Sequence, residues 1–453
     1  MLKIVTAQLK VQPGHPSENT ENMLTMIAQA KKQGADLIIF PEMAVPGYLL
    51  GDTWEQYAFL QDCEECGQDI INASQDIAII FGNVAVDWDK KNCDGRVRKY
   101  NALFTAWQGK LVQPRNMPYP YVIKTLMPNY REFDDTRYFF GLKQLAEEMG
   151  TQAAKLIGTV PLTIKGQDYN IGGFLCEDGW SEDYNLAPVE ILTCQGVDML
   201  VNISASPYTL GKNGKRHRVF GKQAKAAGVP LFYVNNVGIQ NNGKTVYTFD
   251  GSSTLYNGQG LMVDCLPKYQ QGMGIYELDK IQAMPKFQRE KKPDIAHIFT
   301  AIEYAVKEFL ADIHMDKVVI GISGGIDSAV AAALYAHILG PEKVLLVNMP
   351  SVYNSATTKG LAQELAVNLG CNYTIMPIQE SVDHTIDQLE HIPVTFLKDG
   401  SKFNLQVSSF VAENIQARDR SARVLAGAAA AFGGGFTCNA NKAETTVGYS
   451  TLY

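Results

Sequence analysis

One stretch of the chain combines residue types suited to binding a polyphosphate. Val318–Ile322 is an apolar run typical of a buried strand, and it leads through two glycines into a helical pattern. A glycine turn between a strand and a helix directs backbone N–H groups and a helix N-terminus at an anion. Glycines also let the main chain approach phosphate oxygens closely, because they have no Cβ. The candidate phosphate-binding residues are Gly321, Ile322, Ser323, Gly324, Gly325, Ile326, Asp327 and Ser328.

The carboxylate of Asp327 within this stretch predicts a metal ion. A carboxylate would repel a bare phosphate, so its presence favours a divalent cation, Mg²⁺, that arrives with a nucleotide. The string is neither a Walker pattern nor a dinucleotide-binding fingerprint. It resembles the pyrophosphate-holding loop of the N-type ATP pyrophosphatases, which cleave ATP between its α and β phosphates. The alternative is an ordinary strand-to-helix turn.

Three residues in the first half of the chain suit the chemistry of amide hydrolysis. Glu42 and Cys176 each end an apolar, strand-like run, and Lys124 lies in the mostly apolar segment 121–127. A thiol that attacks an amide needs a base to take its proton. The oxyanion that forms needs a cation or N–H donors. Taken singly, each residue has an ordinary reading as a buried thiol, a strand-end carboxylate or a surface charge.

The two halves of the chain carry different patterns. Residues 1–280 hold many short strand-like runs with a few helices, which predicts an α/β or α+β domain with a mixed sheet. Residues 281–294 are polar and basic with two prolines, which indicates a linker. Residues 295–453 alternate helices and strands, which predicts a doubly wound parallel sheet with its ligand at the strand C-termini. The expected strands are Ile4–Leu9, Leu37–Phe40, Ile77–Val86, Leu156–Ile164, Ile171–Leu175, Met199–Ile203, Leu231–Asn235, 318–322, Val344–Met349 and Tyr373–Ile378, and the expected helices are 21–33, 186–195, 295–311, 327–339 and 355–369.

Composition narrows the class of protein. The chain has 453 residues, 46% of them hydrophobic and 19% charged, with a net charge of −7, which disfavours non-specific nucleic-acid binding. The sequence predicts neither a membrane span nor a signal peptide. Eight cysteines in so long a chain suggest a reducing cytoplasm rather than a disulfide framework. Cys63 and Cys66 have metal-ligand spacing, but without a second pair they are expected to be thiols on one helix.

The flanks of the three amide-hydrolysis candidates resemble the nitrilase superfamily. Phe40-Pro41-Glu42, Lys124 followed by MPNYREFDDTRYF, and Phe174-Leu175-Cys176-Glu177-Asp178-Gly179-Trp180 occur in the order which that family uses. The resemblance implies an α-β-β-α sandwich and a catalytic set of Glu42, Lys124 and Cys176. Asp135 stands where related glutaminase domains usually have Glu, so its support of the lysine is expected to be weaker or to use a water. The resemblance also implies a glutamine pocket formed by Tyr130, Ser206 and Lys212, although Lys212 can also be read as part of a solvated basic loop.

A nitrilase-like half followed by the Ser-Gly-Gly-Ile-Asp-Ser loop resembles the glutamine-dependent NAD synthetase family. The resemblance implies that glutamine, ATP and nicotinic acid adenine dinucleotide are substrates. Ammonia from the first half would displace AMP from an adenylate made in the second, after pyrophosphate has left. NAD is then a product rather than a cofactor. A tunnel for ammonia and a homo-oligomer, dimeric or higher, are further expectations.

Four residues near the end of the chain extend this resemblance. Asn414 and Arg418 match the family's substrate-contacting helix and are expected to bind the deamido-NAD substrate. Glu444 is expected to contact that substrate and to hold Mg²⁺ together with Asp327. Asn439 stands where the family usually has Thr and is expected to contact ATP. The family continues beyond the position of Tyr453, so the chain resembles a C-terminally shortened member. Two alternatives stay open: a stand-alone amidase with a degenerate second half, and a non-catalytic nucleotide-sensing module.

Overall fold

The chain forms two compact units, Met1–Ala305 and Val306–Tyr453, and the boundary falls inside helix α8 (Asp294–Asp312). In the described ranges, no helix is long and apolar enough to cross a bilayer. This computed structural model describes residues 2–130, 133–241, 245–288, 293–352 and 356–448.

Two sheets form the centre of the first unit. One has the strand order β15-β1-β2-β3-β4-β5, with β6 paired to β4, and the other has the order β14-β13-β10-β9-β8-β7. The strands of the first sheet are β1 (Lys3–Gln8), β2 (Leu37–Ile39), β3 (Ala78–Lys91), β4 (Val97–Trp107), β5 (Lys110–Leu111), β6 (Val122–Ile123) and β15 (Gly272–Glu277). Those of the second are β7 (Val160–Ile164), β8 (Gln167–Leu175), β9 (Met199–Ser204), β10 (Leu231–Asn235), β13 (Thr254–Tyr256) and β14 (Met262–Cys265), and β11 (Val237–Asn241) and β12 (Val246–Asp250) form a separate hairpin.

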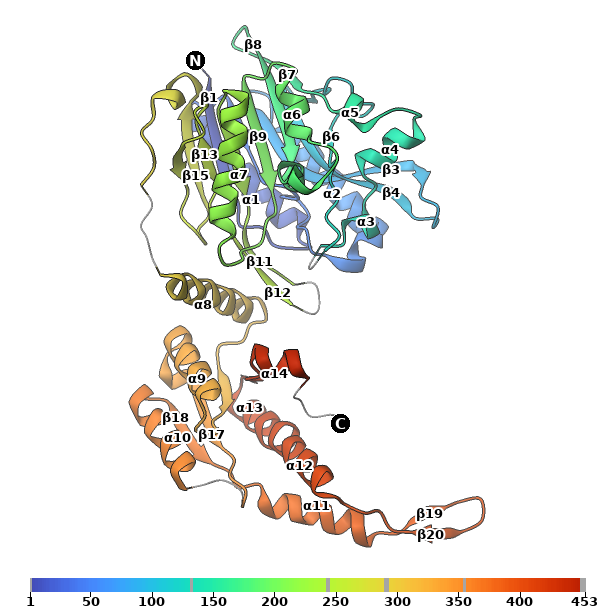
Figure 1. Ribbon diagram of the computed structural model, residues 1–453, viewed down its shortest axis with the longest axis vertical. Helices are drawn as coiled ribbons and strands as arrows, with labels where there is room; N and C mark the ends of the chain where they lie inside the picture. Colours follow the sequence, from blue (N-terminus) through green and yellow to red (C-terminus); the bar gives the residue numbers. More distant parts are fainter. Residues whose placement is uncertain (1, 131–132, 242–244, 289–292, 353–355, 449–453) are drawn as a thin grey trace. The chain divides into compact units, whose positions relative to one another are not determined.

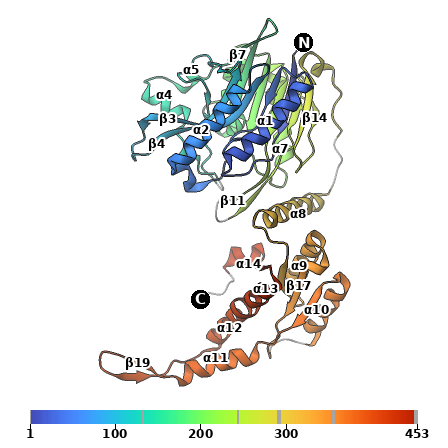
Figure 2. The ribbon, with the colours of Figure 1, turned by 180° about the vertical axis from the view of Figure 1, so that it is seen from behind.

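Helices cover the outer faces of these two sheets. Side chains such as Ile39 and Val201 pack together between the sheets. Helices α1 (Pro16–Lys32) and α2 (Tyr57–Asn72) cover one outer face, and α6 (Pro188–Thr193) and α7 (Lys212–Ala227) cover the other (Figures 1 and 2). The predicted α-β-β-α sandwich is therefore confirmed. The short helices are α3 (Asp135–Tyr138), α4 (Leu142–Glu148) and α5 (Ala153–Leu156).

A four-stranded parallel sheet with helices on both faces forms the second unit. Its order is β18 (Asn372–Ile375), β17 (Val344–Asn348), β16 (Val318–Gly321) and β21 (Gly435–Phe436). Alternate residues of β16 face opposite sides: Ile320 packs with Ala332 and Ala362, whereas Val319 packs with Val382 and Leu425. Because side chains alternate between the two faces and helices cover both, the predicted doubly wound sheet is confirmed. The other elements are α9 (Ile326–Leu339), α10 (Ala356–Leu369), α11 (Gln379–His391), β19 (Val394–Phe396), β20 (Ser401–Phe403), α12 (Ser409–Arg418), a π-helical segment (Asp419–Leu425), α13 (Ala426–Phe432) and α14 (Lys442–Val447).

Some element boundaries differ from the sequence-based expectation. The run expected as a strand from Leu156 begins only at Val160, because the preceding residues form α5. Gly158 lies against the backbone of Arg115, where an added Cβ would approach the carbonyl oxygen to 1.7 Å. The basic stretch beginning at Lys212 lies in helix α7 rather than in a solvated loop. Cys63 and Cys66 are buried on α2 as expected, and neither forms a disulfide.

Candidate active sites

Glu42 lies fully buried just beyond the end of β2. Its segment presses against β3 at Gly82, where an added Cβ would stand 2.4 Å from the backbone nitrogen of Met43. The Oε1 atom accepts hydrogen bonds from Lys124 Nζ at 2.9 Å and from Asn101 Nδ2 at 2.8 Å. The Oε2 atom accepts one from the backbone N–H of Ala205 at 2.7 Å. The carboxylate is thus fixed in place by three donors from three different segments.

Lys124 directly follows β6 and lies between two carboxylates. Besides Glu42, its Nζ donates to Asp135 Oδ2 at 2.8 Å and to the Tyr48 hydroxyl at 3.2 Å. Tyr48 in turn donates to the other oxygen of Asp135. Burial alone would lower the pKa of Lys124, but Asp135 and Glu42 raise it well above its ordinary value. The shorter Asp135 therefore contacts the lysine directly, and the expected bridging water is not needed.

Cys176 occupies the turn at the end of β8, where its backbone has a φ of +32°. Few non-glycine residues adopt a positive φ, and such strain must be held by the surroundings. The buried carboxylate of Asp178 accepts hydrogen bonds from the backbone N–H groups of Leu126 at 2.7 Å and Thr125 at 3.0 Å. It also accepts one from Leu175 at 3.3 Å, so it ties the turn to the lysine segment.

Burial and a neighbouring carboxylate favour the thiol form of Cys176 over the thiolate. Burial raises the pKa of Cys176, and the carboxylate of Glu42 raises it further. The positive charges of Lys124 and Lys212 act in the opposite direction but are weaker than burial. Attack on an amide therefore needs a base that takes the proton as the new bond forms.

A cavity of about 820 Å³ opens beside this cluster. Cys176, Tyr130, Ser206 and Lys212 all line it, so three residues expected in a glutamine pocket share one cavity with the thiol. The Tyr130 hydroxyl donates to Glu177 at 3.1 Å. The Nζ atom of Lys212 donates to a backbone carbonyl, that of Pro207, at 3.2 Å. Both signs of charge line the cavity, an arrangement that suits a zwitterionic amino acid.

The glycine loop of the second unit connects β16 to α9. Gly324 has a φ of +87°, and a Cβ there would stand 2.4 Å from the Thr358 carbonyl oxygen. Gly325 has an ordinary φ of −88° and precedes the first turn of α9. The two serine hydroxyls, of Ser323 and Ser328, lie 3.2 Å apart, and Ser323 Oγ accepts a hydrogen bond from Gly325 N at 3.2 Å. Of these two glycines, only Gly324 adopts a positive φ, which a residue with a side chain would disfavour.

A second cavity, of about 460 Å³, adjoins this loop. Gly321, Ile322, Ser323 and Asn439 line it together with residues of the π-helical segment. Gly324 and Gly325 belong to the loop and Ile326, Asp327 and Ser328 form the first turn of α9; none of these five residues is in that lining.

The predicted deamido-NAD and metal residues lie outside the lining of the second cavity. Asn414 is buried and donates to Phe410 within α12, whereas Arg418 is exposed at the end of that helix. Asp327 and Glu444 are linked through Asn441: Asn441 Nδ2 donates to Asp327 Oδ1 at 3.3 Å, and its backbone N–H donates to Glu444 Oε2 at 2.9 Å.

Several residues that shape these sites were not singled out from the sequence. Asn101 and Tyr48 carry no motif signal, because their contacts join segments far apart in the chain. Asp178 could have been singled out from the sequence, because it lies two residues beyond Cys176 in the same motif. Arg420 lines the second cavity, and it lies two residues beyond Arg418, which the resemblance assigned to substrate binding.

The folds and sites define a class of enzyme in which an amide-hydrolysing unit is joined to a nucleotide-binding one. Residues 3–286 match the family model of the carbon-nitrogen hydrolases, and residues 298–453 match that of the NAD synthases. A glutamine-dependent NAD(+) synthetase of Synechocystis is 32% identical over all of this chain and 76% of its own length. That of Acinetobacter baylyi is 30% identical over all of this chain and 74% of its length. The chain belongs to the glutamine-dependent NAD(+) synthetase family.

A solved structure supports the same assignment. Glutamine-dependent NAD+ synthetase from Acinetobacter baumannii, in complex with adenosine diphosphate, aligns with a TM-score of 0.79. Its sequence is 28% identical, and the alignment covers all of this chain and 77% of that one. The predicted enzyme class, a carbon–nitrogen ligase with glutamine as amido donor, is confirmed by these relatives.

Proposed function

We propose that this chain amidates nicotinic acid adenine dinucleotide to NAD with ammonia that it releases from glutamine at Glu42, Lys124 and Cys176. ATP is consumed in the reaction and leaves as AMP and pyrophosphate. One observation carries the proposal: the Glu42–Lys124 pair, 2.9 Å apart, is buried beside the cavity that Cys176 lines, in a chain of this family. Residues 1–280 would perform the hydrolysis and residues 295–453 the ligation, joined by 281–294.

The first half-reaction uses the thiol as nucleophile. Cys176 Sγ attacks the side-chain amide carbon of glutamine while Glu42 takes the thiol proton. Lys124 stabilises the oxyanion and Glu42 returns the proton to the leaving ammonia. Water then hydrolyses the thioester to glutamate, with Glu42 again as base. Tyr130, Ser206 and Lys212 would hold the amino-acid end of the substrate.

The second half-reaction activates a carboxylate. The carboxylate of the deamido substrate attacks the α-phosphorus of ATP, and pyrophosphate leaves. Ammonia then attacks the carbonyl carbon of the adenylate and AMP departs. The Gly321–Ser328 loop and Asn439 would hold ATP, and Asn414, Arg418 and Glu444 would hold the other dinucleotide. Because Asn414 and Arg418 lie outside the lining of the second cavity, this substrate would extend beyond that cavity.

Asp327 and Glu444 fit the needs of Mg²⁺ in part. Mg²⁺ in nucleotide sites is commonly held by one or two carboxylates together with phosphate oxygens. Both residues offer such oxygens, and both contact Asn441. Within the described residues, no three His, Cys, Asp or Glu side chains cluster closely enough to hold a metal by themselves. Bound there, Mg²⁺ would offset the negative charge of the leaving pyrophosphate.

Isotope-labelled substrates test the proposal on the full chain. Reactions contain ATP, Mg²⁺, nicotinic acid adenine dinucleotide and either amide-¹⁵N glutamine or ¹⁵N-ammonium, and mass spectrometry follows NAD, AMP and glutamate. We expect ¹⁵N in NAD from both sources, with one AMP formed per NAD. The Cys176→Ala variant should lose incorporation from glutamine and keep that from ammonium, whereas Asp327→Asn should lose both. NAD formation from glutamine by Cys176→Ala would refute the assigned nucleophile.

We also propose a cellular location for the protein, its assembly into an oligomer and a route for ammonia. Eight free cysteines support a reducing cytoplasm. Assembly into a dimer or larger oligomer, and a tunnel for ammonia, remain predictions. Adding unlabelled ammonium to the reaction with labelled glutamine tests the tunnel, because a sealed route leaves the ¹⁵N content of NAD undiluted.

A further inference from the structure

A buried arginine lies behind one wall of the larger cavity. Arg216 points inward from α7 and its side chain is 1% exposed. Its Cζ atom lies 4.7 Å from the ring centroid of Tyr233. Its Nη1 atom donates to Asn213 Oδ1 at 2.5 Å, but among the described residues Nε has no hydrogen-bond partner. A buried charge of this kind is often less stabilising than an apolar side chain of similar size, so stability alone accounts for it poorly.

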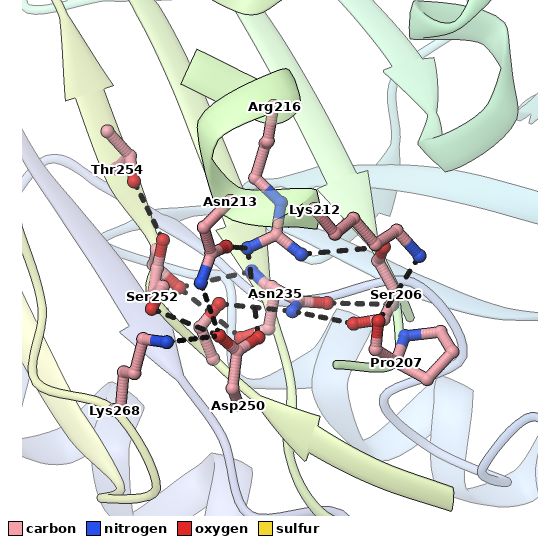
Figure 3. A network of polar contacts seen from close by, with 12 residues as sticks. Ser206, Pro207, Lys212, Asn213, Arg216, Asn235, Asp250, Ser252, Thr254 and Lys268 are labelled. Carbon is pink, nitrogen blue, oxygen red and sulfur yellow. Dashed lines mark hydrogen bonds and ion pairs between the residues drawn. The ribbon is translucent and has the colours of Figure 1, made fainter. Parts of the chain in front are cut away.

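Asp250, at the end of β12, provides the opposite charge. Its Oδ1 atom lies 3.7 Å from Arg216 Nη1, and Figure 3 draws the two side chains facing each other. Its Oδ2 atom accepts a hydrogen bond from Asn213 Nδ2 at 2.8 Å and lies 3.4 Å from Lys268 Nζ. Asn213 therefore bridges the two charged groups. The network links the first turn of α7 to the β11–β12 hairpin.

The other end of the guanidinium reaches the cavity wall. Arg216 Nη2 lies 3.5 Å from Ser206 Oγ, at the long end of hydrogen-bond distances. The backbone of Ser206 is held on both sides by the Asn235 amide, at 2.9 Å from its N–H and 3.1 Å from its carbonyl. Contacts that are long in a free enzyme often tighten when substrate binds. Ser206, Lys212 and Lys215 line the cavity, so the wall carries two lysines at its surface and Arg216 behind Ser206.

We propose that Arg216 is a positioning residue of the amide-hydrolysis site. Asp250 and Asn213 orient its guanidinium, which holds the Ser206 hydroxyl and the first turn of α7 in place for the carboxylate end of an α-amino-acid substrate. This inference rests on the proposed function of the cavity. It assigns Arg216 to substrate binding rather than to the chemistry at Cys176.

Replacing Arg216 by lysine in the full chain tests the role. Lysine keeps the charge but cannot reach Ser206, Asn213 and Asp250 together, because it lacks the planar fork. We expect the KM for glutamine to rise about 10-fold, as the loss of one charge-assisted contact implies, with kcat within about 3-fold. Iodoacetamide has no amino-acid end, so its rate of reaction with Cys176 should be unchanged. Arg218→Lys, an exposed arginine on the same helix, is the matched control and should leave all three values unchanged.

Two outcomes would overturn the inference. One is a KM within about 2-fold of the parent. The other is a parallel loss of kcat, alkylation rate and thermal midpoint, which marks a purely structural role. If Arg216→Lys does not fold, Asp250→Asn replaces it, since loss of the orienting charge should raise KM in the same way; an unchanged KM there also overturns the inference. Glutamine hydrolysis by Cys176→Ala would instead contradict the proposed nucleophile, so the two failures are distinguishable.

Discussion

Replacing Glu42 by glutamine should slow catalysis while making Cys176 more reactive. The two side chains have the same shape, but glutamine keeps only one acceptor oxygen and cannot take a proton from the thiol. If that oxygen stays with Lys124 and Asn101, the new NH₂ group faces the backbone N–H of Ala205, which now donates to Glu42 at 2.7 Å. The Ala205 N–H is then left without an acceptor, because the NH₂ group that it faces is itself a donor.

The size of each effect follows from these contacts. A buried N–H without an acceptor costs about 1–3 kcal/mol of stability. Breaking a buried ion pair outright costs about 3–5 kcal/mol, but Lys124 keeps Asp135 at 2.8 Å, so the smaller loss is expected. Removing a general base lowers kcat by about 10²–10⁴-fold. The glutaminase reaction should therefore fall by that factor in a protein that still folds.

The reactivity of the thiol should change in the opposite direction. Burial is the main cause that raises the pKa of Cys176, and the negative charge of Glu42 is the second. Without that charge the pKa of the thiol falls, so a larger fraction is thiolate at neutral pH. Alkylation by iodoacetamide should then be faster in Glu42→Gln than in the parent.

Both rates are measured at pH 7 on the same preparations. Glutamate release gives the hydrolysis rate, and mass spectrometry of the peptide containing Cys176 gives the alkylation rate. Glu147→Gln, which changes an exposed glutamate on α4, is the control and should alter neither. Slower alkylation in Glu42→Gln would refute the electrostatic reasoning, and unchanged hydrolysis would refute the assignment of the base.

Three further predictions concern other positions. Gly324→Ala should abolish ATP-dependent NAD formation, since a Cβ there meets a carbonyl oxygen of α10 at 2.4 Å; Gly360→Ala, with open space around it, should not, and equal activity of the two would contradict the role of the turn. Burial raises the pKa of Asp178 to about 7, so the folded protein keeps a proton that the unfolded chain releases, and stability should fall by up to about 4 kcal/mol as pH rises from about 4 to 7. Asp178→Asn should remove that decline in denaturant titrations at several pH values, and an unchanged slope would contradict the assignment. Asp135→Glu, although it introduces the family's usual residue, should lower stability by about 1–3 kcal/mol because the shorter side chain already contacts its lysine directly, and a higher thermal midpoint would refute this.

The doubly wound sheet of the second unit could be predicted from the sequence, because strands and helices alternate along it. In β16, Val318 and Ile320 face one side of the sheet and Val319 the other, so a fully apolar run is what a strand covered on both faces requires. The Ser-Gly-Gly turn after β16 could also be predicted, because its conformation depends on residues that are adjacent in the sequence.

The contacts that hold Lys124 in place could not be predicted from the sequence in the same way. Asn101 lies on β4, whose buried Arg98 and Lys99 break the apolar pattern that marks a strand. Tyr48 meets Asp135 across 87 positions of sequence. Contacts of this kind form only when distant segments come together in the folded chain, so the spacing of residues in the sequence does not predict them.

In the proposed mechanism, the charges around Lys124 explain why one cation is held by two carboxylates. With Cys176 as a thiol, Glu42, Lys124 and Asp135 together carry one net negative charge. When Glu42 takes the thiol proton, that negative charge leaves the carboxylate and appears on the oxyanion, so the total charge in the buried site does not change. Lys124 stays bonded to Asp135 throughout, so little needs to reorganise as the charge moves. A single carboxylate partner would leave the lysine unpaired once Glu42 is neutral, and Asp135 prevents this.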